Sequence, residues 1–279
     1  MLNKILVLGS SGQVGDYLCD YLRRNGNEVI EFDVVESENQ DLRIPDNTLL
    51  DEYMKQCDFV YFLAFDVGGS RYLKKYQHTF DFTDNNIKLM TNTFCSLKKH
   101  NKPFVFASSQ MSNMDYSPYG SQKRLGEHYT DLLGGLIVKF WNVYGIEKDI
   151  EKAHVITDFI LKAKDHKLVD MLTDGTEERQ FLYAEDCSEA LDTVRMNYYN
   201  IDRKRELHIT NHKWDSILQV ADEVTKHFPA DIVPSKNKDD VQKGKRNEPD
   251  PYILDLWTPK TTLAEGIEII CNHYKENAE

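Results

Sequence analysis

The sequence predicts an α/β protein built on a doubly wound parallel sheet, with a smaller lobe towards the C-terminus. Short apolar runs alternate with longer amphipathic stretches through the first half of the chain. Several of these runs are almost continuously hydrophobic, which is typical of strands buried on both faces. A β-α-β-α order places parallel strands beside one another and covers both faces of the sheet with helices.

The first half supplies the expected parallel sheet. The expected strands are Lys4–Leu8, Glu28–Asp33, Phe59–Ala64, Pro103–Ala107 and Gly135–Phe140, and the helices between them are Val14–Arg24, Asn47–Gln56, Thr83–His100 and Ser117–Leu133. We therefore expect residues 1–150 to form a nucleotide-binding domain.

After Gly145 the alternation becomes less regular. We expect helices over Val155–Ala163, Glu185–Met196, Trp214–His227 and Thr262–Tyr274, strands over Leu168–Leu172 and Glu206–Thr210, and a solvated loop over Ser235–Asp250. In this interpretation residues 185–212 return to the first domain. Residues 151–184 and 213–279 then form the smaller, substrate-binding lobe.

Composition excludes several classes of function. The chain has 279 residues, 41% of them hydrophobic, and a formal net charge of -12. This charge opposes non-specific binding to nucleic acid or to an anionic membrane surface, so we expect neither partner. An anionic ligand would need its own local arginines.

The cysteines and the N-terminus indicate the compartment. Five cysteines are scattered without metal-ligand spacing, so we expect no metal site and no disulfide framework, but buried thiols in a reducing environment. The N-terminal residues run directly into a strand without signal-peptide features, and no apolar run reaches membrane-spanning length. These features favour a cytoplasmic protein.

A glycine-rich turn joins the first expected strand to the first helix. It contains Gly9, Ser11, Gly12, Gln13, Val14 and Gly15. Glycines at this spacing permit a tight turn and let backbone N–H groups approach a pyrophosphate at the helix N-terminus. A Rossmann-type dinucleotide site is therefore expected.

The acidic end of the second strand indicates which dinucleotide binds. Asp33 lies 18 residues after Gly15, where a carboxylate accepts hydrogen bonds from the ribose hydroxyls and repels a 2′-phosphate. This favours NAD over NADP. Glu31 and Glu36 are the alternative carboxylates.

A serine, a tyrosine and a lysine form a candidate reactive site. Ser109 ends the fourth expected strand, and Pro118 suits the first turn of a helix that carries Tyr119 and Lys123 on one face. To exchange a proton near neutral pH, the phenol must lose about three pKa units from about 10, and a nearby ammonium with an oxidised nicotinamide would supply this shift. A second Tyr-x-x-x-Lys pair, Tyr144 and Lys148, has no preceding strand-end serine and fits a structural role.

These motifs together resemble the extended short-chain dehydrogenase/reductase family, in its NAD-dependent epimerase/dehydratase branch acting on nucleotide sugars. The similar segments are GSSGQVG, DFVYFLA, NNIKLMTN, PYGSQKRLGE, VKFWNVYG, TDGTEERQFLYAEDC and LWTPKTTLAEGI, in the family's order. The resemblance implies the catalytic residues Ser109, Tyr119 and Lys123. It places Asp41, Leu42, Leu63 and Ala64 along the NAD, and Asn142, Arg179 and Arg246 at a nucleotide-diphosphate sugar. It also implies a homodimer formed through the helices Thr83–His100 and Ser117–Leu133.

Departures from the family pattern narrow the chemistry. Gln110 and Met111 stand where dehydratases of the family carry an acid and a base, which disfavours dehydration. Nine residues separate Ser109 from Tyr119, a shorter link than usual, which predicts a more open sugar pocket. The segments VGGS and AHVITDFI resemble the GDP-fucose synthase and GDP-mannose epimerase group, and this resemblance makes His154 a candidate acid. The cysteine that partners such a histidine in that group is replaced here by Met111.

We expect an NAD-dependent nucleotide-sugar epimerase or oxidoreductase that transfers hydride at a sugar carbon, C4, with Tyr119 as acid and base. One alternative is an NAD(P)H-dependent 4-ketosugar-nucleotide reductase, which would use the same residues. The other is a non-catalytic dinucleotide-sensing protein that kept the fold.

Overall fold

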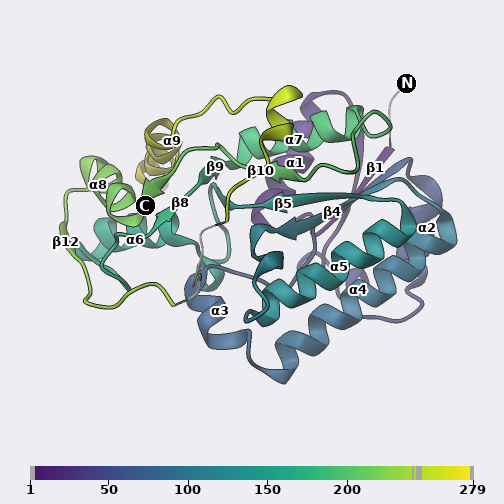
Figure 1. The fold of residues 1–279 in the computed structure, drawn as a ribbon, viewed down its shortest axis with the longest axis horizontal. Helices are drawn as coiled ribbons and strands as arrows, with labels where there is room; N and C mark the ends of the chain where they lie inside the picture. The colour runs from purple at the N-terminus through teal and green to yellow at the C-terminus, as the bar shows by residue number, and fades with distance from the viewer. Residues whose placement is uncertain (1–3, 241, 243–246, 277–279) are drawn as a thin grey trace.

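A parallel sheet forms the centre of the computed structural model, which describes residues 4–240, 242 and 247–276. Within these residues the sheet has the strand order β10-β5-β4-β3-β1-β2, and every neighbouring pair is parallel. Its strands are β1 Lys4–Leu8, β2 Glu28–Phe32, β3 Phe59–Phe62, β4 Phe104–Ser109, β5 Leu136–Phe140 and β10 Leu207–Ile209 (Figure 1). The predicted doubly wound α/β fold is confirmed.

Helices bury both faces of this sheet. α1 Gln13–Arg24 and α7 Ala184–Met196 cover one face, while α2 Thr48–Gln56, α4 Phe80–His100 and α5 Pro118–Leu133 cover the other. β1 shows the alternation that results: Ile5 and Val7 pack with α1 and α7, and Leu6 and Leu8 pack with α2 and α4. The order of the strands reverses between β1 and β3, so their carboxyl ends meet at the point where such sheets bind ligands.

A second hydrophobic cluster lies beside the sheet. It is built by α6 Val155–His166, α8 Ile217–His227 and α9 Leu263–Glu276. Three two-stranded pairs accompany them: β7 Leu168–Asp170 with β12 Asp231–Val233, β8 Glu178–Arg179 with β11 Asp215–Ser216, and β6 Asn142–Tyr144 with β9 Phe181–Tyr183. The division of the chain into two domains stays a prediction, which limited proteolysis would test.

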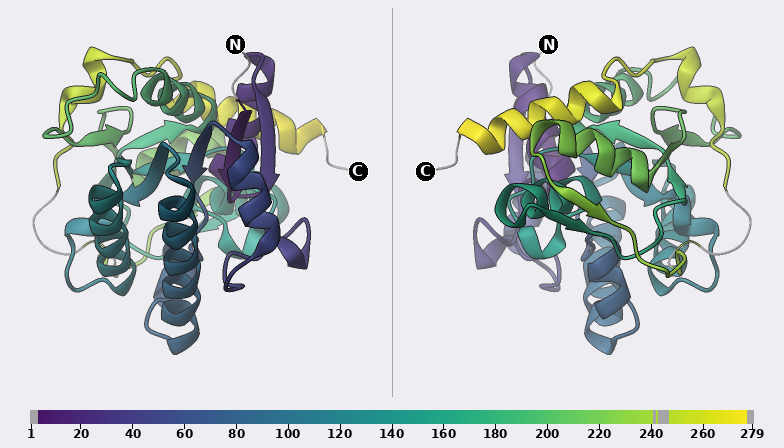
Figure 2. Two further views of the ribbon diagram at one scale, coloured as in Figure 1. Left: turned by 90° about the vertical axis from the view of Figure 1, so that its right-hand side faces the viewer. Right: turned by 90° about the vertical axis from the view of Figure 1, so that its left-hand side faces the viewer.

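Local capping explains where several helices differ from their expected bounds. α4 begins at Phe80 instead of Thr83 because the Thr79 hydroxyl accepts the Phe82 N–H. α8 begins at Ile217 instead of Trp214 because Ser216 and Gln219 form a capping box. The short helix α3, Ser70–Tyr76, was not expected. Figure 2 shows the blue start of α4 projecting from the body in both views.

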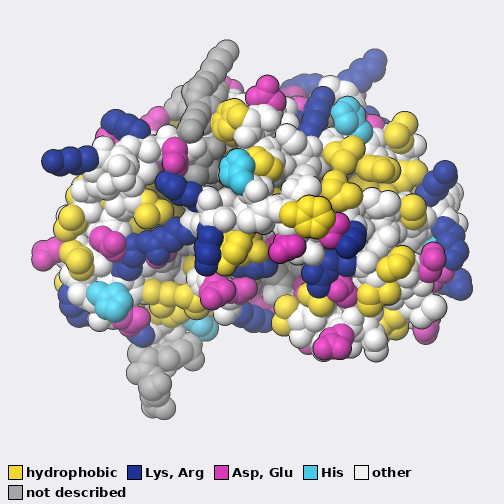
Figure 3. All heavy atoms as spheres, turned by 90° about the horizontal axis from the view of Figure 1, so that it is seen from below, with side chains coloured by type: hydrophobic (Ala, Val, Ile, Leu, Met, Phe, Trp, Pro, Cys, Tyr) yellow, Lys and Arg dark blue, Asp and Glu magenta, His cyan; other side chains and the backbone are white. Residues whose placement is uncertain are grey.

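The cysteines differ from expectation at one position. Cys19, Cys57, Cys187 and Cys271 are buried, but Cys95 is exposed on the outer face of α4. Charges of both signs are interspersed on the face seen in Figure 3, so the net negative charge is not gathered into one patch there. Among the described helices, none has the length and apolarity needed to span a bilayer.

Candidate active site

A pocket of about 960 Å³ opens at the carboxyl ends of the central strands. It brings together all thirteen predicted cofactor residues: Gly9, Ser11, Gly12, Gln13, Val14, Gly15, Asp33, Asp41, Leu42, Leu63, Ala64, Tyr119 and Lys123. His154 lines the same pocket. Ser109, Asn142 and Arg179 do not line it, and Arg246 lies outside the described residues.

The three glycines of the turn have different reasons to be glycine. Gly9 has φ +88°, and a Cβ there would lie 2.6 Å from the Ala64 nitrogen. A Cβ on Gly15 would lie 2.0 Å from the Gly9 carbonyl oxygen. A Cβ on Gly12 would meet that oxygen at 3.4 Å, an ordinary contact, so protein packing does not require glycine there.

The start of α1 fits a pyrophosphate. Gly12 is the N-cap residue and offers no side-chain acceptor to the first turn of the helix. The residues of that turn line the pocket, so their N–H groups can donate to a ligand, and Gly12 leaves space for it. This is the arrangement in which a helix N-terminus binds a phosphate anion.

Two carboxylates hold the turn beside the expected adenosine ribose. Asp33 accepts hydrogen bonds from the backbone N–H groups of Ser11 at 3.1 Å and Val35 at 3.0 Å. Glu36 accepts the Ser11 hydroxyl at 2.8 Å. Asp33 and Glu36 both line the pocket, whereas the alternative Glu31 pairs with Arg23 at the surface.

Tyr119 and Lys123 lie one turn apart on α5, both buried. The Ser117 hydroxyl caps the helix at Gly120, and a Cβ on Gly120 would lie 2.2 Å from the Met111 carbonyl oxygen, so glycine lets α5 pack closely on the preceding turn. Ser109 acts on the Tyr119 phenol to lower its pKa, against the effect of burial. The Lys123 Nζ donates to the Ala107 carbonyl oxygen at 2.7 Å and lies 3.7 Å from the centre of the Phe65 ring.

Burial sets the proton affinities of these two groups. It raises the pKa of Tyr119 to about 12, and Ser109 opposes this shift. Burial lowers the pKa of Lys123 to about 7, and the charge of Glu127 opposes it. The protein's own groups therefore do not produce the lowered phenol pKa expected from the sequence, and that lowering would need the charge of a bound ligand.

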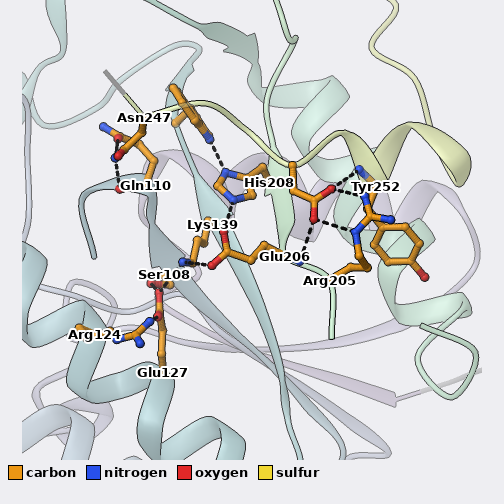
Figure 4. A network of polar contacts seen from close by, with 12 residues as sticks. Ser108, Gln110, Arg124, Glu127, Lys139, Arg205, Glu206, His208, Asn247 and Tyr252 are labelled. Carbon is orange, nitrogen blue, oxygen red and sulfur yellow. Dashed lines mark hydrogen bonds and ion pairs between the residues drawn. The ribbon is translucent and has the colours of Figure 1, made fainter. Parts of the chain in front are cut away.

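A network of polar side chains joins β4, α5 and β5 to the residue before β10 (Figure 4). The Ser108 hydroxyl donates to Glu127 at 2.6 Å, and Arg124 donates to the other oxygen of the same carboxylate at 2.9 Å. Lys139 lies 3.7 Å from Glu127 and 2.6 Å from Glu206. The sequence did not indicate this network, although Glu127 lies one turn after Lys123.

Gln110, at the position of the dehydratase acid, is tied to the C-terminal part of the chain. The Asn247 side-chain amide donates to both the backbone and side-chain oxygens of Gln110, each at 2.7 Å (Figure 4). Gln110 is 3% exposed and does not line the pocket.

His154 has a partner that the sequence did not reveal. Glu147 accepts hydrogen bonds from the His154 backbone N–H at 2.9 Å and Nδ1 at 2.6 Å. The loop is packed closely, because a Cβ on Gly69 would lie 2.4 Å from the Ala153 carbonyl oxygen. The two segments that resemble GDP-fucose synthase, VGGS and AHVITDFI, thus touch one another.

Two of the predicted substrate residues, Arg179 for the diphosphate and Asn142 for the sugar, have partners outside this pocket. Arg179 forms an ion pair with Asp239 and donates to the Glu178 carbonyl oxygen at 2.8 Å. The Asn142 backbone N–H donates to Gln180 at 3.2 Å, which joins β6 to the segment before β9.

The second Tyr-x-x-x-Lys pair does not converge. Tyr144 is 2% exposed, and its hydroxyl contacts the Thr262 carbonyl oxygen at 3.4 Å. Lys148 reaches solvent and pairs with Asp16 at 2.8 Å. Among the described residues, no group of three or more His, Cys, Asp and Glu side chains is arranged to hold a metal ion.

A family model matches most of this architecture. The NAD dependent epimerase/dehydratase family model aligns with residues 5–210, from β1 to the end of the main sheet. The chain belongs to this family. The resemblance predicted from the motifs is thereby confirmed, and NAD is the cofactor. The glycine turn, the uncapped start of α1 and Asp33 are the residues that would hold it.

Relatives and solved structures agree with this assignment. A putative UDP-glucose 4-epimerase of Methanocaldococcus jannaschii is 26% identical, over 98% of this chain and 99% of its own length. The UDP-glucose 4-epimerase of Thermotoga maritima, solved with UDP-glucose, has a TM-score of 0.79 at 19% identity, covering 99% of this chain and 100% of that chain. A GDP-mannoheptose C4 reductase from Campylobacter jejuni, with NADP bound, has a TM-score of 0.78 at 20% identity over 98% of both chains.

Proposed function

We propose that the protein is an NAD-dependent nucleotide-sugar epimerase or oxidoreductase that transfers hydride at a sugar carbon, C4, with Tyr119 as the acid and base. The observation that carries this proposal is the position of Lys123 one turn after Tyr119 on α5, with Ser109 acting to lower the pKa of the Tyr119 phenol against the effect of burial. Tyr119 and Lys123 share a pocket with the glycine turn.

Each residue has a defined part in the proton transfer. Bound NAD supplies a reversible hydride acceptor and, when oxidised, a positive charge. The Tyr119 oxygen takes the proton of the sugar hydroxyl, and Ser109 holds the same sugar oxygen by a hydrogen bond. Lys123 cannot swing freely because its Nζ is bound to Ala107, so its ammonium stays near the phenol whenever it is protonated.

The proposed substrate is a nucleotide-diphosphate sugar. Asn142 would contact the sugar, and Arg179 and Arg246 would bind the diphosphate, for which a guanidinium offers bidentate hydrogen bonds. Arg179 would then exchange its present partner Asp239 for the diphosphate. UDP-glucose, bound in the Thermotoga maritima enzyme, is the first compound to test.

Dehydration is disfavoured in this proposal. Gln110 cannot serve as an acid, and both of its oxygens accept hydrogen bonds from Asn247. Met111, 5% exposed, has no group that could act as a base. A 4,6-dehydratase product would contradict this part of the proposal.

The test begins with identification of the dinucleotide in purified protein, followed by NMR of UDP-, GDP-, dTDP- and CDP-sugars. Tyr119→Phe should lower turnover by roughly a hundredfold or more. Tyr144→Phe, the matching change in the second pair, should not. Unchanged turnover in Tyr119→Phe would refute the role of Tyr119.

The same experiment separates the alternatives. An epimerase retains its dinucleotide through many turnovers, whereas a one-way 4-ketosugar reductase consumes added NADH stoichiometrically. Binding of NAD without turnover of any sugar in the panel would favour a dinucleotide-sensing protein.

Assembly and location belong to the proposal as well. We propose a cytoplasmic homodimer in which α4 and α5 of each copy pack together. Light scattering would measure the mass of the protein in solution, and a monomer at micromolar concentration would contradict the dimer.

A further inference from the structure

We propose that the Trp141 indole forms the wall of the pocket against which the nicotinamide ring of NAD lies, and that His208 fixes the plane of this indole. The proposal rests on NAD being the cofactor. It also rests on the proposed function for the place of the nicotinamide, beside Tyr119 and Lys123, but not on the identity of the sugar. Because its test measures binding without turnover, it can fail while the proposed reaction stands.

Trp141 lies beside the reactive end of the sheet. Ser109 is paired with Phe140 in the register of β4 and β5, and Trp141 is the next residue along the chain. Its side chain lines the same pocket as Tyr119 and Lys123. Since hydride transfer requires the nicotinamide to lie next to these groups, an aromatic side chain at this position can stack with its ring.

The indole N–H identifies the tautomer of its partner. Trp141 Nε1 lies 3.0 Å from His208 Nδ1. An indole N–H can only donate, so Nδ1 must accept and the ring hydrogen is on Nε2. His208 Nε2 then donates to Glu206 Oε2 at 2.7 Å.

The partner is itself held in place. His208 is 2% exposed and lies in β10, paired with Lys139 of β5. Lys139 donates to Glu206 at 2.6 Å and lies 3.7 Å from Glu127, with only 4% of its side chain exposed. Each group restrains the next, so the His208 ring has a fixed position from which to accept the indole hydrogen.

A second contact restrains the ring from another side. Trp214 packs edge-on against Trp141, with ring centroids 5.5 Å apart and planes at 79°. Because the Trp141 indole is held at its N–H by His208 and at its edge by Trp214, it loses little conformational entropy when a ligand stacks on it. Such a preorganised surface binds more tightly than a mobile one.

The test compares NAD⁺ with ADP-ribose, which has the same adenosine and pyrophosphate but no nicotinamide. Tryptophan fluorescence of the full chain is followed while each ligand is added. NAD⁺ should quench the emission by ring contact, and ADP-ribose should not. Trp141→Phe should remove the quenching. Trp257→Phe should keep it, because Trp257 is buried in the core cluster that packs α1 and α7 on the sheet.

Calorimetry of the same variants gives the affinities. NAD⁺ should bind the wild type about two- to tenfold more tightly than ADP-ribose, the range expected for one aromatic contact. Equal quenching by the two ligands would overturn the proposal, and so would quenching that survives in Trp141→Phe.

His208 is tested through the ratio of the two dissociation constants. His208→Leu removes the acceptor and should reduce the preference for NAD⁺ over ADP-ribose, while His208→Gln keeps an acceptor and should restore it. General loss of stability would weaken both ligands together and leave the ratio unchanged. An unaltered ratio in His208→Leu would therefore refute the positioning role.

Discussion

Glu147 holds His154 at two points, its backbone N–H at 2.9 Å and its ring Nδ1 at 2.6 Å. Burial alone would raise the pKa of Glu147, but the hydrogen bonds from His154 outweigh it and keep the pKa below its ordinary value. A buried carboxylate in the wall of the pocket thus stays charged and fixes the direction of the histidine ring.

We expect Glu147→Ala to lower the free energy of unfolding by about 2 kcal/mol at pH 7, because two donors of His154 lose their acceptor. A carboxyl group with a lowered folded pKa stabilises the protein above its unfolded value of 4.5, and this contribution is lost as pH falls through the folded pKa. The difference between variant and wild type should therefore shrink below about pH 4.5. Urea unfolding at several pH values measures the difference in free energy of unfolding, with Glu151→Ala, at an exposed residue, as control. A difference that does not change with pH would contradict the proposed charge on Glu147.

The buried Lys123 should change how the free energy of unfolding depends on pH above pH 7. Its pKa is about 7 in the folded protein against 10.5 ordinarily, so between these values the unfolded chain binds one more proton. Stability of the wild type should rise relative to Lys123→Met by up to about 1.4 kcal/mol per pH unit in this window. Unfolding at pH 7, 8 and 9 without dinucleotide checks this, with exposed Lys88→Met as control. Parallel curves for wild type and Lys123→Met would be evidence against a neutral lysine.

Two glycines of the turn should respond differently to alanine. Gly15→Ala places a Cβ 2.0 Å from the Gly9 carbonyl oxygen and should lower the melting temperature or prevent folding. Gly12→Ala, with its closest contact at 3.4 Å, should keep the melting temperature but weaken NAD binding by roughly tenfold or more. Calorimetry of both variants measures the two effects. Unimpaired NAD binding by Gly12→Ala would mean that the pyrophosphate does not lie against this glycine.

Asp33 and Glu36 should both disfavour NADP, since each places a carboxylate at the expected adenosine ribose. Glu36→Gln and Asp33→Asn should each improve NADPH binding relative to NADH by about fivefold, the effect of one charge at short range in water. Dinucleotide fluorescence gives both affinities. Glu38→Gln, in the same loop but outside the pocket, is the control. If Glu36→Gln leaves the ratio of affinities as in the wild type, Asp33 alone sets the preference.

The sequence predicted the elements whose signal is local. The apolar runs of β1 and β4, the glycine turn and the proline that opens α5 are each read from a few consecutive residues, and the structure contains them with small shifts of boundary. The strands β6, β8, β9, β11 and β12 were not predicted, because two or three residues carry little periodicity. β7 and β10 are equally short but lie within longer apolar runs, and both were predicted.

Contacts across long separations could not be predicted in this way. Lys139 and Glu206 lie 67 positions apart, and Gln110 and Asn247 lie 137 apart. Glu147 and His154 are only seven apart, but they sit in an irregular loop with no repeating pattern. Tertiary packing determines all three pairs, and each modifies the site that the local motifs indicate.

The position of β10 has a consequence for how the chain folds during synthesis. β5 becomes an interior strand only when Leu207–Ile209 pairs with it, long after its own residues have left the ribosome. Until then Leu136 and Val138 belong to an open sheet edge, and Lys139 lacks Glu206 as a counter-ion. A fragment ending near residue 150 would keep that edge open, so completion of the central sheet depends on residues that follow α6 in the chain.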